Sequence, residues 1–177
     1  MLLCDLVSPL RIRVSPGEFS LHKYYVGLEH IEKNTGVVKP SLTSDEKPSS
    51  AKTFFPNGAL LFGKIRPELR KVGVSSCEGI CSTDISVFIP VDEVQANAIA
   101  LVLRTDRAAD YFSSLRTGTS LPRVREDDIL RFNMDWCSGQ LLKELQELST
   151  LLATFRLSAL DVERKCRQLE ARISSLL

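Results

Sequence analysis

The hydrophobic residues of this 177-residue chain follow two different patterns, and the change from one to the other falls near residue 138. Before it, short apolar runs are separated by turn signals such as Asn57-Gly58, which precedes the run at 59–63 (ALLFG). Short apolar runs bounded by turns and rich in Val, Ile and aromatic residues predict strands. The strands expected from this pattern lie at 24–28, 59–63, 70–74 and 85–90.

Helical spacing follows the last of these strands. Residues 92–115 predict two helices, at 93–103 and 106–115, with Asp106 as the N-cap of the second. Residues 40–52 (PSLTSDEKPSSAK) combine two prolines with Ser, Thr and Lys, so we expect a loop there. This order of elements predicts a mixed α/β domain over residues 1–137.

The second pattern is a heptad repeat. The chain has no proline after residue 122 and no glycine after residue 139, and Ser138 is the expected N-cap of a helix. Apolar positions then recur at alternating steps of four and three, a period of 3.5 sustained over five heptads. This seam consists of Leu141, Leu145, Leu148, Leu152, Phe155, Ala159, Val162, Cys166, Leu169, Ile173 and Leu176. Residues 138–177 are therefore predicted to form one long helix.

The length of this helix decides how its seam is covered. A helix of about 40 residues is roughly 60 Å long, whereas a domain of about 137 residues has a diameter of roughly 30–40 Å. Part of the seam must therefore contact another long helix, and the sequence predicts no second one. We expect a homodimer through this helix. The alternatives are a helix that folds back across its own domain, or a break near Phe155.

Composition and charge narrow the classes of function. The chain is 44% hydrophobic and 25% charged, as in globular proteins. A net charge of +1 excludes a highly basic coat-type nucleic-acid binder, although a local basic face remains compatible with it. No apolar run is long enough to span a membrane, and Asp5 comes too early for a signal peptide. The odd number of cysteines, five, favours a reducing cytoplasm.

The sequence offers no convincing catalytic, cofactor or metal motif. Residues 58–64 (GALLFGK) fit the first seven positions of a phosphate-binding loop, but Ile65 stands where Ser or Thr would hold magnesium. The carboxylates at 126–128 follow two arginines and indicate a solvated turn or helix start, and no glycine-rich turn would cradle S-adenosylmethionine. Cys77 and Cys81 lack two further zinc ligands, because the chain has only two histidines, so ordinary thiols are favoured.

One segment carries a local excess of positive charge. Lys64, Arg66, Arg70 and Lys71 surround a proline-containing corner and are our candidate DNA-binding residues. Arg66 and Arg70 are the stronger candidates for base contacts, because a guanidinium group can donate two hydrogen bonds to guanine. The loop from Ser41 to Lys52 is a less certain addition. The alternative for the whole segment is a solvated charged turn.

Three blocks of the sequence occur in the order and spacing of a known family. They are 25–32 (YVGLEHIE), 61–72 (LFGKIRPELRKV) and 78–85 (EGICSTDI). Together they resemble the target-recognition domain of type I restriction-modification specificity subunits, and the resemblance extends through the helix after Gln140. One departure is the stretch 133–140, which lacks the proline that the family often carries before its helix.

The resemblance implies an α/β target-recognition domain over 1–137, followed by a coiled-coil spacer helix over 138–177. A full specificity subunit has two such domains and two helices that pair antiparallel, so this chain resembles a half subunit that acts as a homodimer. Its implied partners are double-stranded DNA, a DNA adenine methyltransferase subunit and a restriction subunit, all cytoplasmic, with catalysis in those partner subunits and no cofactor of its own. The alternative is a coiled-coil adaptor whose α/β domain binds protein.

Overall fold

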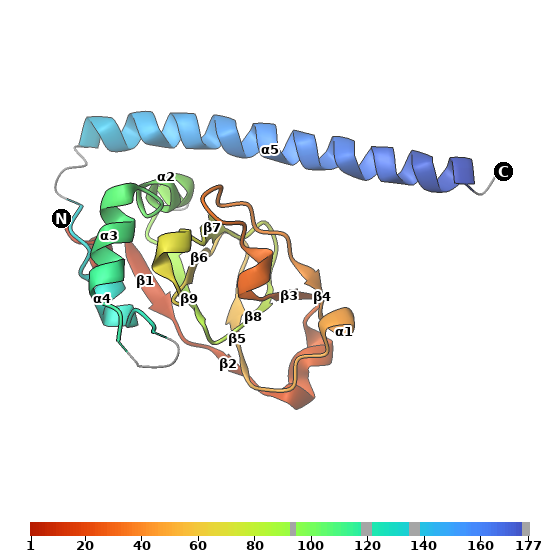
Figure 1. Cartoon of the computed structure of the whole chain (residues 1–177), viewed down its shortest axis with the longest axis horizontal. Helices are drawn as coiled ribbons and strands as arrows, with labels where there is room; N and C mark the ends of the chain where they lie inside the picture. The colour runs from red at the N-terminus through yellow and green to blue at the C-terminus, as the bar shows by residue number, and fades with distance from the viewer. Residues whose placement is uncertain (93–94, 118–121, 135–138, 175–177) are drawn as a thin grey trace.

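The computed structural model describes residues 1–92, 95–117, 122–134 and 139–174, and its centre is a pair of β-sheets (Figure 1). The first sheet is antiparallel throughout and has four strands. In spatial order these are β1 (Val7–Leu10), β9 (Ile85–Pro90), β6 (Leu60–Gly63) and β7 (Val72–Val74). The second sheet has five strands and contains one parallel pair, β3 with β8. Its order is β2 (Arg13–Val14), β5 (Lys52–Phe55), β8 (Gly79–Cys81), β3 (Tyr24–Val26) and β4 (Ser41–Leu42).

Helices and 3-10 turns surround these sheets. The α-helices are α1 (Thr43–Glu46), α2 (Ala96–Val102), α3 (Asp106–Ser114), α4 (Glu126–Leu130) and α5 (Gly139–Ser174). The 3-10 turns are η1 (Leu3–Asp5), η2 (Pro16–Leu21), η3 (Leu28–His30) and η4 (Pro67–Leu69). The mixed α/β class expected from the sequence is confirmed.

The position of strand β6 explains why its sequence is apolar without interruption. Side chains alternate between the two faces of a strand, and here both faces are covered. Leu60 and Phe62 lie in the cluster under α2 and α3, whereas Leu61 lies in a second cluster with Phe55 and Val87. These three residues of β6 are at most 1% exposed. A strand buried on both sides needs apolar residues at every position, which is the run that the sequence shows.

Several predicted elements are confirmed, and two details are wrong. Strands appear within 24–28, 59–63, 70–74 and 85–90, and helices within 93–103 and 106–115. The N-cap of α3 is Thr105 rather than Asp106, because the Thr105 side chain accepts a hydrogen bond from the Ala108 amide. The predicted loop at 40–52 contains β4, α1 and the first residue of β5. Ser138 lies outside the described residues.

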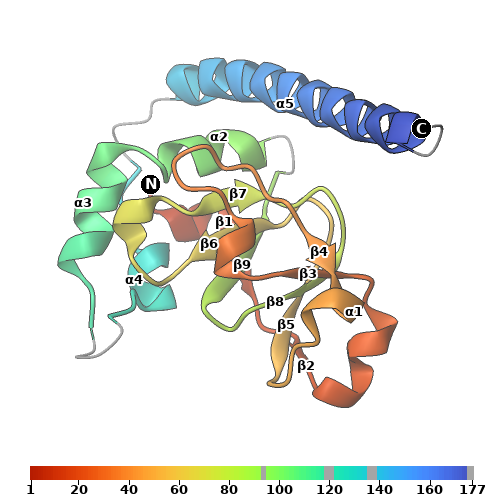
Figure 2. The ribbon, with the colours of Figure 1, turned by 45° about the vertical axis from the view of Figure 1, so that its right-hand side comes forward.

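Helix α5 is one continuous helix of 36 residues, so the break considered near Phe155 does not occur. It runs past the domain and packs on it mainly through α2 (Figure 1). Figure 2 shows the same arrangement from another direction, with β2 and α4 on the side of the domain away from α5. No helix in the described part of the chain is long and apolar enough to cross a membrane.

Candidate nucleic-acid interface

The corner between β6 and β7 is built from an unusual backbone. The 3-10 turn η4 is flanked by Arg66 and Arg70, whose φ angles of 50° and 52° lie in the left-handed region. A residue with a Cβ pays roughly 1–2 kcal/mol for this conformation, and such strain persists only where the surrounding structure holds it. The corner must therefore be fixed by contacts outside itself.

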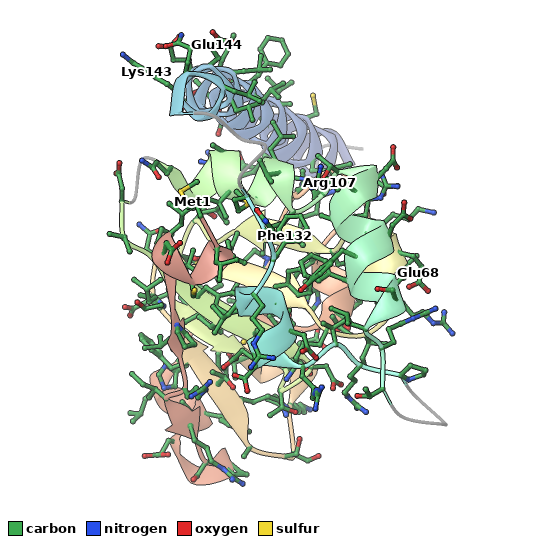
Figure 3. All side chains as sticks on the ribbon, turned by 90° about the vertical axis from the view of Figure 1, so that its left-hand side faces the viewer. Met1, Glu68, Arg107, Phe132, Lys143 and Glu144 are labelled. Carbon is green, nitrogen blue, oxygen red and sulfur yellow. The ribbon has the colours of Figure 1, made fainter. Side chains whose placement is uncertain are left out.

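Those contacts come from α3 and the segment that follows it. Arg70 forms an ion pair with Asp106, the first residue of α3. Arg116 lies 3.3 Å from the Glu68 carboxylate in the turn itself. Figure 3 shows Glu68 on the same side of the domain as α3. Two ion pairs thus join a strained corner to the neighbouring helix.

The four predicted DNA-binding residues fall into two groups. Arg70 and Lys71 are held by the protein: Arg70 by Asp106, and Lys71 by the Leu28 carbonyl, which accepts from its Nζ at 2.6 Å. Arg66 is exposed and Lys64 half-buried, and neither side chain has a hydrogen-bond or ion-pair partner among the described residues. Arg66 and Lys64 are therefore the two that are free to contact a ligand.

A cleft of about 660 Å³ opens beside Lys64, at the junction of the two sheets. Five cationic side chains line it against two carboxylates. They are Arg11, Arg13, Lys52, Lys64 and Arg125, with Glu126 and Asp127. On a chain whose net charge is only +1, this is a local concentration of positive charge. Among the candidates from the sequence, the cleft includes Lys64 and, from the predicted 41–52 loop, Ser50, Ala51 and Lys52.

Three of these cations, Arg11, Arg13 and Arg125, are not among the candidates from the sequence. Arg11 and Arg13 are two residues apart at the start of β2, a spacing that puts alternate side chains of an extended segment on one side. That spacing was a usable signal. Arg125 gave none, because its approach to β2 depends on the fold of more than a hundred intervening residues.

The apolar seam of α5 divides into a covered and an uncovered part. Leu141 and Leu145 are half-buried and pack against the cluster under α2. Leu148, Leu152 and Phe155 are 50%, 40% and 76% exposed. Further along, Val162 is 60% exposed, while the side chains of Leu169, Ile173 and Leu176 lie outside the described ones. The domain therefore covers the start of the seam and leaves its described residues from Leu148 to Val162 exposed.

The two remaining chemical candidates are already engaged. Cys81 is fully buried, and burial raises the pKa of its thiol to about 12, which keeps it protonated and a poor metal ligand. His30, Glu29 and Glu46 bring their ligand atoms together. However, the Gly27 amide donates to His30 Nδ1 at 2.9 Å, and Nε2 lies 3.3 Å from the Glu46 carboxylate. His30 thus serves to join η3 to α1.

Known proteins resemble this chain in sequence and in fold. No family model matches the chain. It is 27% identical over 129 residues to the EcoDI type I restriction enzyme specificity subunit of Escherichia coli. The aligned region covers 72% of this chain and 28% of that protein. The chain therefore spans less than a third of this curated relative.

Three solved structures share the fold. The HsdS subunit of Thermoanaerobacter tengcongensis superposes with a TM-score of 0.62 at 21% identity, over 93% of this chain and 43% of its own. A chain from a study of complex assembly and conformational transition in the type I R-M system gives 0.58 at 21% identity, over 97% and 44%. The type I S subunit of M. genitalium gives 0.55 at 14% identity, over 93% and 42%.

The relative in sequence and the structures of the same fold are thus proteins of type I restriction-modification systems. The resemblance to specificity subunits that the three sequence blocks indicate is confirmed.

Proposed function

We propose that this chain is a sequence-specific DNA-recognition subunit of a type I restriction-modification system. The observation that carries the proposal is the coincidence of two likenesses: a specificity subunit is its curated relative over 129 residues, and specificity-subunit chains share its fold. The free Arg66 and Lys64 and the basic cleft beside them supply the charge that a DNA-binding surface needs.

In this proposal the chain works as a half subunit. It spans 42–44% of the solved chains that share its fold. The domain is residues 1–137 and the spacer is residues 138–177. The exposed seam residues Leu148, Leu152 and Phe155 support pairing of α5 with the same helix of a second copy, in antiparallel orientation. Two-fold symmetry would then present two domains to a bipartite, palindromic site.

The chemistry would belong to partner subunits. The chain would direct an adenine methyltransferase subunit, and a restriction subunit where the system has one, to the bound site in the cytoplasm. Its own contribution is positional and non-catalytic, because the candidate site consists mainly of guanidinium and ammonium groups, and Glu126, one of its two carboxylates, is engaged in an ion pair with Arg11. Such groups bind phosphates and base edges.

The deciding experiment measures duplex binding and methylation separately. The purified chain should bind mixed-sequence duplex DNA weakly at low salt, with an affinity that falls as salt rises. Added methyltransferase subunit should tighten binding to one sequence and should methylate adenine, whereas neither protein alone should do so. A chain that never binds duplex DNA, with or without that subunit, would contradict the proposal and favour the protein-binding adaptor.

A further inference from the structure

The cleft between the two sheets contains buried polar groups that the fold itself does not satisfy. Ser86, the second residue of β9, lines the cleft and is 2% exposed. Its Oγ is a buried atom with no hydrogen-bond partner in the part of the chain that the structure describes. A buried hydroxyl left without a partner costs roughly 1–3 kcal/mol. An unpaired donor in a cleft points to a ligand that accepts from it.

Lys52 is the second such group. It lines the same cleft and is 7% exposed, so its ammonium group is buried. Nζ donates to the Ser50 carbonyl at 2.6 Å and to Ser50 Oγ at 2.8 Å, and a lysine ammonium has three donors. Burial lowers the pKa of Lys52, as expected for a positive charge that lacks a counter-ion.

The rim of the cleft adds charge that is also available. Arg13 is exposed and Lys64 half-buried, and neither side chain has a partner among the described residues. Arg11 is paired with Glu126 at 2.6 Å, and Arg125 with Asp128 at 3.0 Å, so these two guanidinium groups are already engaged within the protein. The donors that remain for a ligand are Ser86 Oγ–H, one N–H of Lys52, and the side chains of Arg13 and Lys64.

This combination is specific for an anion with several oxygens. The available groups are mainly donors and cations, with Asp127 as the one carboxylate of the lining that has no ion pair within the described part of the chain. The four donors converge from β2, β5, β9 and the residue after β6, which are distant in the sequence. A phosphate group accepts several hydrogen bonds and carries negative charge, and a volume of about 660 Å³ admits more than a single ion. A cationic ligand would be repelled by Arg13, Lys52 and Lys64, and a neutral ligand would leave their positive charge unbalanced.

We propose that this cleft is a phosphate-binding site, and that its occupant is a backbone phosphodiester of duplex DNA. This inference rests on the proposed function, and it assigns the side of the domain that the duplex contacts. The cleft is formed by β2, β5 and α4, among other elements, and Figures 1 and 2 place these three on the side away from α5. DNA bound there would not compete with a second copy for the seam of α5.

The test compares the salt dependence of DNA binding in single variants of the full-length chain. Arg13→Ala and Lys64→Ala should each weaken binding to a mixed-sequence duplex roughly 5–10-fold at 0.1 M salt, and should reduce the slope of log affinity against log salt by about 1. The effect should be the same for every duplex sequence, because phosphate contacts carry no base information. Lys143→Ala is the charge-matched control: Lys143 is exposed on α5, far from the cleft (Figure 3). It should leave the slope unchanged.

Ser86→Ala separates binding from folding. The substitution removes an unpaired hydroxyl, so thermal unfolding should occur at the same or a higher temperature, while DNA affinity falls about threefold or more.

NMR titration of the parent chain with inorganic phosphate, and separately with duplex DNA, distinguishes the source of the phosphate. Shifts at Ser86 and Lys52 with duplex DNA support the proposal, whereas shifts with millimolar phosphate but none with duplex overturn it in favour of a free-phosphate site.

The outcomes also separate this inference from the proposed function. If the parent chain binds duplex DNA and the Arg13, Lys64 and Ser86 variants bind it equally well, the cleft is not the contact site, and the recognition function stands. If the parent binds no duplex even with a methyltransferase subunit, the recognition function fails and the cleft assignment fails with it.

Discussion

Arg70 and Asp106 form an ion pair that joins the corner after β6 to the first turn of α3. Arg70 is a candidate DNA contact by sequence, and the ion pair gives it a structural role instead. Its guanidinium is 29% exposed and its Nε is buried, so the side chain is part of the support of the corner. The neighbouring Arg66 is the residue that this support leaves exposed to solvent.

A double-mutant cycle on this pair tests the support directly. Arg70→Ala, Asp106→Ala and the double variant should give a coupling energy of about 0.5–1 kcal/mol in chemical denaturation, because Asp106 is largely exposed and solvent screens the pair. Both single variants should also weaken DNA binding, since they loosen the corner that holds Arg66. Additive stability effects, with no coupling, would show that the pair does not hold the corner.

The left-handed backbone at Arg66 predicts opposite effects on stability and binding. Arg66→Gly should raise the free energy of unfolding by about 1 kcal/mol, because glycine adopts a positive φ without a Cβ clash. The same change should weaken DNA binding, because it removes the exposed guanidinium. Arg66→Ala is the control: it removes the side chain and keeps the strain, so only binding should change. Calorimetry and fluorescence anisotropy measure the two quantities.

The exposed seam of α5 predicts a dimer. Leu148→Glu combined with Leu152→Glu should give a monomer in sedimentation, because each buried leucine contributes roughly 1.5–3 kcal/mol to association. Thr150→Glu is the matched control, since Thr150 is exposed and lies off the seam. It adds a negative charge to the same helical turn and should leave the dimer intact. A monomeric parent chain at micromolar concentration would remove the basis for this prediction.

Lys52 predicts a specific dependence of stability on pH. In the folded state, burial lowers the pKa of Lys52 below its ordinary value of 10.5. The folded protein therefore releases this proton more readily than the unfolded chain does. The buried charge of Lys52 destabilises the folded state. This destabilisation is fully present below the lowered pKa and is lost as the pH rises toward 10.5. The stability of the parent relative to Lys52→Met should therefore increase with pH across that window. Urea denaturation at several pH values checks this, and a constant difference would contradict it.

Cysteine reactivity should follow burial. Because the pKa of Cys81 is raised to about 12, roughly one thiol in ten thousand is ionised at pH 8. Cys4 and Cys166 are exposed and should be alkylated by iodoacetamide within minutes, whereas Cys81 should react only after denaturation. Mass spectrometry of the alkylated peptides measures each site. Rapid labelling of native Cys81 would show that β8 opens readily.

The sequence predicts the local elements of this fold better than it predicts their assembly. β6 stands out because it is buried on two sides and is therefore apolar without a break, and β9 stands out because Ser86 is the one polar residue in an otherwise apolar, largely buried strand. The sequence does not predict strand β4 and helix α1 within the segment 40–52, because Ser, Asp and Lys-Pro favour loops when tertiary contacts are ignored. Their positions depend on pairing with β3 and on His30, which the local sequence does not encode.

The same limit applies to the candidate site. The corner with Arg66 and Arg70 is contiguous in the sequence, so its charge is visible there. The cleft joins Arg13, Ser86 and Arg125, which no local pattern connects. An unpaired hydroxyl such as Ser86 Oγ can be recognised only once the neighbouring strands are in place.

The left-handed backbone conformation of Arg66 and Arg70 predicts how these two positions should vary among related sequences. Drift should replace a strained Arg66 or Arg70 by glycine or asparagine wherever selection is relaxed, because those residues tolerate a positive φ. Lineages that keep arginine at both positions are then those in which the strain is maintained by selection. A survey of relatives at these two positions would separate domains that use the corner from domains that have abandoned it.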